Sequence, residues 1–201
     1  MLNILLFDTE TTGLPTRRGI SALESPDIWP NLLSISWMIC NGPTLIRQES
    51  YIIRPDGWTI PADSIRIHGI TQARAMDDGK PLATVLEHFT RDLKCADRVI
   101  AHNMEFDRNV LFHAYKWHLN QNPLAFWNPL CEFCSMIASK PELKLPSKFQ
   151  FARDPYKNPG LDELYRATFD GKEPPKDAHN ASRDVQVLHA IVCKRWPLSI
   201  V

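Results

Sequence analysis

Four carboxylates and one histidine carry the chemistry that this sequence predicts. They occur in three short segments: Asp8 and Glu10 in Phe-Asp-Thr-Glu-Thr-Thr-Gly-Leu (7–14), Asp107 in His-Asn-Met-Glu-Phe-Asp (102–107), and His179 and Asp184 in His-Asn-Ala-Ser-Arg-Asp (179–184). Four acids gathered in one fold repel one another and lose hydration, so they need a counter-charge. Divalent cations that prefer oxygen ligands supply it, and two of them beside a phosphate make a phosphodiester-cleaving site. The residue types therefore predict metal-dependent cleavage of a phosphodiester.

Each of these residues also has a plainer interpretation. Asp8 and Glu10 could be solvated loop carboxylates, and Asp107 an acid in a first helical turn, which the helix dipole favours. Asp184 could be an exposed acid paired with Arg183. The spacing argues for the functional interpretation, because acids two positions apart on a strand share one face. His179 also stands only five residues before a candidate ligand.

The elements expected around these residues alternate between strands and helices. Apolar runs and turn signals predict strands over 3–7, 32–40, 45–53 and 99–101, and helical spacing predicts helices over 61–68, 72–76, 82–93, 105–118, 161–168 and 181–196. Thr71 is the expected cap of the second helix. Two proline-containing stretches, 15–31 and 141–160, are expected as loop insertions that form a substrate wall, a lid or a partner surface. This order predicts one α/β domain over 1–201, with a mixed sheet and helices on both faces.

The composition is that of an ordinary globular protein. The chain has 201 residues, 44% hydrophobic and 23% charged, with a formal net charge of zero. A net charge of zero does not indicate a basic nucleic-acid-binding surface. Bound cations or a local basic patch can nevertheless attract phosphates without a basic net charge. Five cysteines, an odd number, fit a reducing compartment better than a disulfide framework. With no signal peptide or transmembrane segment recognised, we expect an intracellular, cytoplasmic protein.

The three segments together resemble the motifs of the DnaQ-like 3′–5′ exonucleases of the DEDDh type. They occur in the family's order and span almost the whole chain, and His68-Gly-Ile-Thr71 matches a further family segment. A histidine at position 179, rather than a tyrosine at a shorter spacing, indicates the "h" branch. The resemblance implies a ribonuclease H-like fold: a central mixed five-stranded sheet, with a three-strand antiparallel meander followed by parallel strands.

The resemblance also implies roles for individual residues. Two Mg²⁺ or Mn²⁺ ions would be held by Asp8, Glu10, Asp107 and Asp184, and His179 would be the general base. The terminal nucleotide would meet Thr11, Thr12, Gly13 and Leu14, and His68, Asn103 and Phe106 would position the last nucleotides. Phe106 is equally well explained as a core aromatic. The product would be a nucleoside 5′-monophosphate.

The substrate and partners are less constrained. The resemblance implies that the substrate is a nucleic-acid 3′ end, with single-stranded DNA favoured. The process would be proofreading, repair or degradation. The resemblance leaves open a DNA polymerase or other replication or repair partner, and also a homodimer. Two alternatives remain: an exoribonuclease that trims RNA 3′ ends, and a catalytically dormant nucleic-acid- or polymerase-binding adaptor. Cys131 and Cys134 resemble half of a zinc site but are favoured as ordinary cysteines near a strand end. Trp29 and Trp58 are the tryptophans to examine for base stacking.

Overall fold

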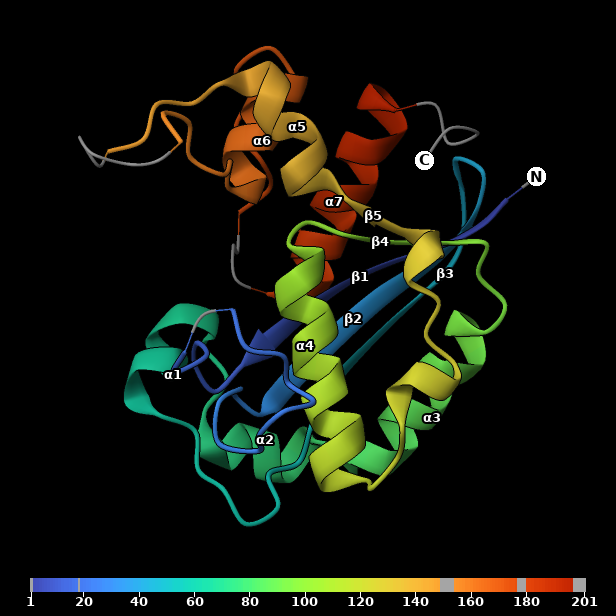
Figure 1. The fold of residues 1–201 in the computed structure, drawn as a ribbon, viewed down its shortest axis with the longest axis vertical. Coiled ribbons are helices and arrows are strands. Elements are labelled where there is room, and N and C mark those ends of the chain that lie inside the picture. The colour runs from blue at the N-terminus through green and yellow to red at the C-terminus, as the bar shows by residue number, and fades with distance from the viewer. Residues whose placement is uncertain (1, 18, 149–153, 177–179, 197–201) are drawn as a thin grey trace.

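A five-stranded mixed sheet forms the centre of the protein (Figure 1), in a computed structural model that describes residues 2–17, 19–148, 154–176 and 180–196. Its strand order is β3-β2-β1-β4-β5, in which β1, β2 and β3 pair antiparallel and β4 and β5 continue in parallel. The strands are β1 (Asn3–Thr11), β2 (Leu32–Asn41), β3 (Thr44–Ile52), β4 (Arg98–Ala101) and β5 (Glu132–Cys134). The expected sheet, a meander followed by parallel strands, is confirmed.

Helices cover both faces of this sheet. They are α1 (Ala62–His68), α2 (Gln72–Asp78), α3 (Leu82–Leu93), α4 (Met104–His113), α5 (Ser135–Leu143), α6 (Leu161–Thr168) and α7 (Ala181–Arg195), with a π-helical turn at Ala114–His118 and 3₁₀ turns at Pro123–Ala125 and Pro129–Cys131. Helices α3 and α4 pack on one face, and α7, backed by α6, packs on the other (Figure 1). Thr71 caps α2 as predicted, because its side chain accepts a hydrogen bond from the Arg74 backbone N–H.

Strand β1 is buried on both faces, which explains its nearly continuous apolar run. Its alternating side chains enter two separate clusters. Leu5 and Phe7 pack with residues of α3 and α4, whereas Ile4 and Leu6 pack with residues of α7. The helices on both sides therefore hold the end of β1 in a fixed place.

The structure corrects several element boundaries. Strand β1 continues through Asp8 and Glu10 to Thr11, four residues beyond the predicted end at Phe7, because it pairs with β2 along this whole length. The expected helix 105–118 is α4 followed by the π-helical turn. Helix α5 was not predicted, since Pro141 lies inside it and was taken as part of a loop. The rest of the 141–160 insertion includes an antiparallel bridge between Pro146 and Tyr156.

Strand β4 is shorter than its neighbour, and this creates space beside β1. The last partner that β4 offers to β1 is Ile100, opposite Leu6. Beyond that pair, the edge of β1 is open to the chain that follows β4, and α4 begins there at Met104. Within the part of the chain that the structure describes, no helix has the length and apolar character needed to span a membrane.

Candidate active site

The C-terminal end of strand β1 presents two carboxylates on one face of the sheet. Asp8 and Glu10 alternate with Thr9 and point to the side of the sheet that α7 covers. Their cross-strand neighbours on β2 are Ser36 and Ser34, both buried. These small side chains leave room for the acids beside them, so the strand itself makes a polar recess.

Helix α7 brings a third carboxylate to this recess. Asn180 caps the helix, because its Oδ1 accepts a hydrogen bond of 3.0 Å from the Ser182 backbone N–H. Gln48 of β3 fixes the same turn to the sheet, with its Nε2 2.7 Å from Ser182 Oγ. Gln186, one turn along, donates to Gln48 Oε1 at 3.0 Å. This anchoring places Asp184, at the start of α7, beside the end of β1.

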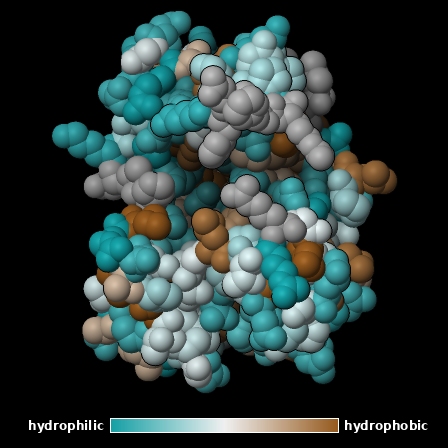
Figure 2. Space-filling view, turned by 60° about the vertical axis from the view of Figure 1, so that its left-hand side comes forward, coloured by the Kyte–Doolittle hydropathy of each residue, from teal (hydrophilic) through white to brown (hydrophobic). Residues whose placement is uncertain are grey.

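The structure brings Asp8, Glu10 and Asp184 together. Each offers one carboxylate oxygen, and these oxygens all lie within 4.8 Å of one another. Three hard oxygen ligands at this spacing suit Mg²⁺ or Mn²⁺. The end of β1 and the start of α7 lie on the left in Figure 1, the side that Figure 2 turns forward. Figure 2 shows that the molecule is hollowed across the middle of this side.

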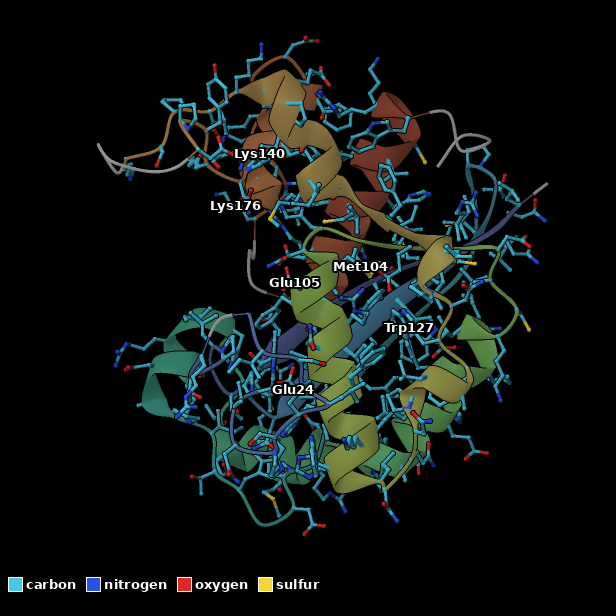
Figure 3. The ribbon with its side chains drawn as sticks, viewed as in Figure 1. Glu24, Met104, Glu105, Trp127, Lys140 and Lys176 are labelled. Atoms are coloured by element: carbon cyan, nitrogen blue, oxygen red, sulfur yellow. The ribbon has the colours of Figure 1, made fainter. Side chains whose placement is uncertain are left out.

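Asp107 reaches the same region from α4 but is held differently. Figure 3 marks the N-terminal end of α4 with the labels of Met104 and Glu105, and Asp107 lies in this first turn. Its Oδ1 accepts a hydrogen bond of 2.6 Å from the Thr9 hydroxyl. It is not one of the three acids within 4.8 Å, so its role as a metal ligand stays a prediction.

The acids strongly perturb one another's protonation. Burial, followed by the charges of Asp107, Asp184 and Glu10, raises the pKa of Asp8 well above its ordinary value. Burial, followed by the charges of Asp184 and Asp107, raises the pKa of Glu10 to about 8. Burial raises the pKa of Asp107 to about 7, against the hydrogen bond from Thr9, which lowers it. A cluster that cannot ionise fully by itself is one that a divalent cation would stabilise.

Two neighbours of the acids were not predicted as site residues. Thr9 stands between Asp8 and Glu10 but faces the other way, so only the contact with Asp107 reveals its place. Arg183 was considered only as the partner of an exposed Asp184. The structure does pair them, with Arg183 Nη1 2.6 Å from Asp184 Oδ1, but the Asp184 side chain is only 13% exposed.

The end of β1 and the turn after it contain the four residues predicted to meet substrate. The Thr11 hydroxyl donates to the Gly13 carbonyl at 2.6 Å, and Thr12 exchanges two hydrogen bonds with the Asn31 backbone at 3.1 and 3.0 Å. Gly13 has a φ of 155°, which residues with side chains rarely adopt. This fixed turn leaves Leu14 78% exposed. An exposed apolar side chain on a rigid turn is suited to contact a base.

The three residues predicted to position the last nucleotides lie on separate elements. His68 is the last residue of α1, and its Nδ1 accepts a hydrogen bond of 3.1 Å from the Ile70 N–H. Asn103 is the N-cap of α4. Phe106 packs against the core and against Trp29, with ring centroids 5.9 Å apart, which agrees with the core interpretation of its role.

The remaining candidates are placed as follows. His179, the predicted general base, lies outside the described residues. Trp58 packs against the cluster around Leu33. Cys134 ends β5 and its thiol donates to the His102 carbonyl at 3.3 Å, whereas Cys131 Sγ accepts from Asn128 Nδ2 at 3.1 Å.

His102 itself is a structural residue of this region. One ring nitrogen, Nδ1, lies 2.9 Å from Ser135 Oγ, and the other, Nε2, lies 3.0 Å from the Pro159 carbonyl oxygen. Burial lowers the pKa of His102 to about 4. The neutral ring therefore joins the start of α5 to the chain just before α6.

Comparison with known proteins agrees with this geometry. The family model described as "Exonuclease" (RNase_T) matches residues 5–192. The fold is similar to that of zinc-bound E. coli exonuclease I (ExoI) in complex with single-stranded DNA, with a TM-score of 0.71 and 16% identity over 96% of this chain and 40% of that chain. It is also similar to exonuclease X in complex with 5′ overhanging duplex DNA, with a TM-score of 0.61 and 20% identity over 94% of this chain and 89% of that chain.

These TM-scores establish a shared fold. This chain spans about two-fifths of the length of ExoI. No curated protein matches the sequence.

Proposed function

We propose, from the premise that this chain belongs to the exonuclease family, that it is a DEDDh-type 3′–5′ exonuclease that releases nucleoside 5′-monophosphates from single-stranded DNA. One observation carries the proposal. Asp8, Glu10 and Asp184, which come from opposite ends of the chain, offer oxygens within 4.8 Å of one another beside Asp107. A fold would not assemble these acids at such electrostatic cost for stability alone.

The residues present fit two divalent cations. The candidate ligands are all carboxylates, the donor type that Mg²⁺ and Mn²⁺ prefer. Asp8, Glu10, Asp107 and Asp184 would hold the ions, with Thr9 orienting Asp107 through its hydrogen bond. Bound ions supply a more acidic water and stabilise charge on the phosphate and the leaving oxygen.

The chain's own residues would activate the attacking water and bind the terminal nucleotide. His179 would accept a proton from the attacking water, since the ordinary pKa of histidine, about 6.5, is close to working pH. The turn at Thr11–Leu14 would hold the terminal nucleotide, with Leu14 against its base. The hollow on this side of the molecule (Figure 2) would give a strand access to the acids.

A single strand is the favoured substrate because the terminal nucleotide must be separated from any partner strand to enter such a turn. The solved relatives include ExoI bound to single-stranded DNA and exonuclease X bound to duplex DNA with a 5′ overhang. Both support DNA as the substrate class to test first.

The decisive experiment uses 5′-labelled single-stranded DNA and RNA of the same sequence. Each is incubated with Mg²⁺, Mn²⁺ or EDTA and with the wild type, His179→Ala or Asp184→Asn. We expect a ladder that shortens from the 3′ end of DNA, requires metal and is lost in both variants. Asp77→Asn, the same change as Asp184→Asn but at an exposed position of α2, is the matched control.

The outcomes separate the alternatives. Faster shortening of RNA than of DNA would replace the DNA proposal with an exoribonuclease. No shortening of either strand by folded wild type in Mn²⁺, together with retained binding of the oligonucleotide, would indicate the dormant adaptor. Activity that survives Asp184→Asn would place the chemistry elsewhere.

A further inference from the structure

Arg183 is a buried cation next to the acid cluster. Its side chain is 9% exposed, and it lies in the first turn of α7. Nη1 donates to Asp184 Oδ1 at 2.6 Å and to Asp162 Oδ1 at 2.8 Å. Nε and Nη2 both donate to the Pro175 carbonyl, at 2.9 and 2.7 Å. A buried guanidinium with this many partners is a rigid junction.

The junction joins polar groups from three segments of the chain. Asp184 belongs to α7, Asp162 to the first turn of α6, and Pro175 to the loop that follows α6. Pro175 is also the near end of the short connection that runs to Asn180, the cap of α7. That connection contains His179 in the sequence. Arg183 thus holds the loop after α6 against the first turn of α7.

The charges around Arg183 also balance. The guanidinium lies between one carboxylate of the acid cluster and one outside it. Asp162, whose side chain is 35% exposed, offsets the positive charge of Arg183. Nη1 therefore shares its charge between the two carboxylates, and one oxygen of Asp184 is held in place.

We propose that Arg183 is a positioning residue of the reaction: it fixes the carboxylate of Asp184 relative to α6 and the loop that follows it. The inference rests on the proposed exonuclease function. Lysine cannot substitute, because one ammonium lacks the planar fork that reaches acceptors on three segments. A displacement of about 1 Å in a catalytic group can cost roughly 100-fold in rate. Loss of the junction should therefore lower kcat far more than it changes substrate affinity.

The test compares Arg183→Lys with Arg195→Lys. Arg195 lies on the same helix, its side chain is 10% exposed, and it is paired with Glu142 at 2.5 Å, away from the acids. Asp162→Asn, which removes an acceptor outside the acid cluster, is a second variant in case Arg183→Lys folds poorly. We measure kcat and KM on 5′-labelled single-stranded DNA at saturating Mn²⁺, Mn²⁺ affinity, and amide hydrogen exchange.

We expect Arg183→Lys to lower kcat by roughly 10- to 100-fold, with KM and Mn²⁺ affinity changed less than about 3-fold. Exchange should rise at the Lys172 amide, which donates to the Phe169 carbonyl, and Asp162→Asn should change the same readouts in the same direction by less. Arg195→Lys should leave kcat and this exchange unchanged.

Three results would overturn the inference. Arg183→Lys could retain kcat within about 3-fold while wild type is active, which leaves the exonuclease proposal intact. The kcat loss could equal that of Arg195→Lys, which would indicate general destabilisation. An inactive wild type would overturn this inference and the proposed function together.

Discussion

Neutralising one acid of the cluster should make the metal-free protein more stable at alkaline pH. In Glu10→Gln, the side chain keeps its shape and loses its charge. Burial and the charges of Asp184 and Asp107 raise the pKa of Glu10 from 4.5 to about 8. The folded protein therefore keeps this proton up to about pH 8, whereas the unfolded chain loses it near pH 4.5.

The sign and size of the effect follow from this difference. Between these pH values the folded state binds more protons than the unfolded state, so its stability falls as pH rises. One pH unit corresponds to 1.36 kcal/mol per proton, so Glu10 alone destabilises the metal-free protein by about 3 kcal/mol between pH 5 and pH 8. Glutamine has no proton to lose, so Glu10→Gln should show a pH dependence flatter by an amount of this order.

Urea denaturation in EDTA at pH 5 and pH 8 measures this directly. Wild type should lose stability between the two values, and Glu10→Gln should lose less. At pH 8, Mg²⁺ should restore stability to the wild type, by about 2.7 kcal/mol at 100 times its Kd, and far less to the variant. Glu87→Gln, the same change at an exposed position of α3, should behave as wild type. Equal pH dependence in all three proteins would refute the packing of the acids described above.

Three further predictions concern neighbours of the cluster. Thr9→Val removes the 2.6 Å hydrogen bond to Asp107, so it should lower the free energy of unfolding, measured in urea, by about 1.5–3 kcal/mol. It should also raise the Mg²⁺ concentration needed for half-maximal activity, and an unchanged metal requirement would contradict this. Because burial lowers the pKa of His102 to about 4, its neutral form adds stability that is present above pH 6.5 and lost as pH falls toward 4. In urea denaturation, His102→Gln should reduce the loss of stability between pH 6.5 and pH 4 by about 3 kcal/mol. An unchanged loss of stability over this pH range would contradict the prediction. Leu14→Ala should raise KM for the oligonucleotide several-fold while the free energy of unfolding changes by less than about 0.5 kcal/mol, since the side chain is 78% exposed; an unchanged KM would remove Leu14 from the substrate contacts.

The sequence predicted the central elements well because their signals are local. The apolar run of β1, the helical spacing over Leu82–Leu93 and the cap at Thr71 each lie within a few residues. The end of β1 was placed too early because Asp8 to Thr11 resemble turn residues. Pairing with β2, a contact between distant segments, keeps them in the strand. Helix α5 was missed for the opposite reason, since a proline inside a helix is locally unfavourable and tolerated by its surroundings.

The candidate site shows the same limit. The acids were recognised by their motifs, and the structure brings Asp8, Glu10 and Asp184 together. The hydrogen bond from Thr9 to Asp107 and the three segments that Arg183 joins could not be predicted, because they depend on how β1, α4, α6 and α7 pack. Local patterns identify which residues carry chemistry, and tertiary contacts decide how each is held.

The acids that α7 completes lie far apart in the sequence. Asp8 and Glu10 belong to the first strand, whereas Asp184 belongs to the last helix. A growing polypeptide therefore carries an incomplete centre until synthesis has passed α7, the helix that also covers Ile4 and Leu6 of β1. The order of synthesis therefore delays assembly of the complete acid cluster until α7 has been made and has packed on β1.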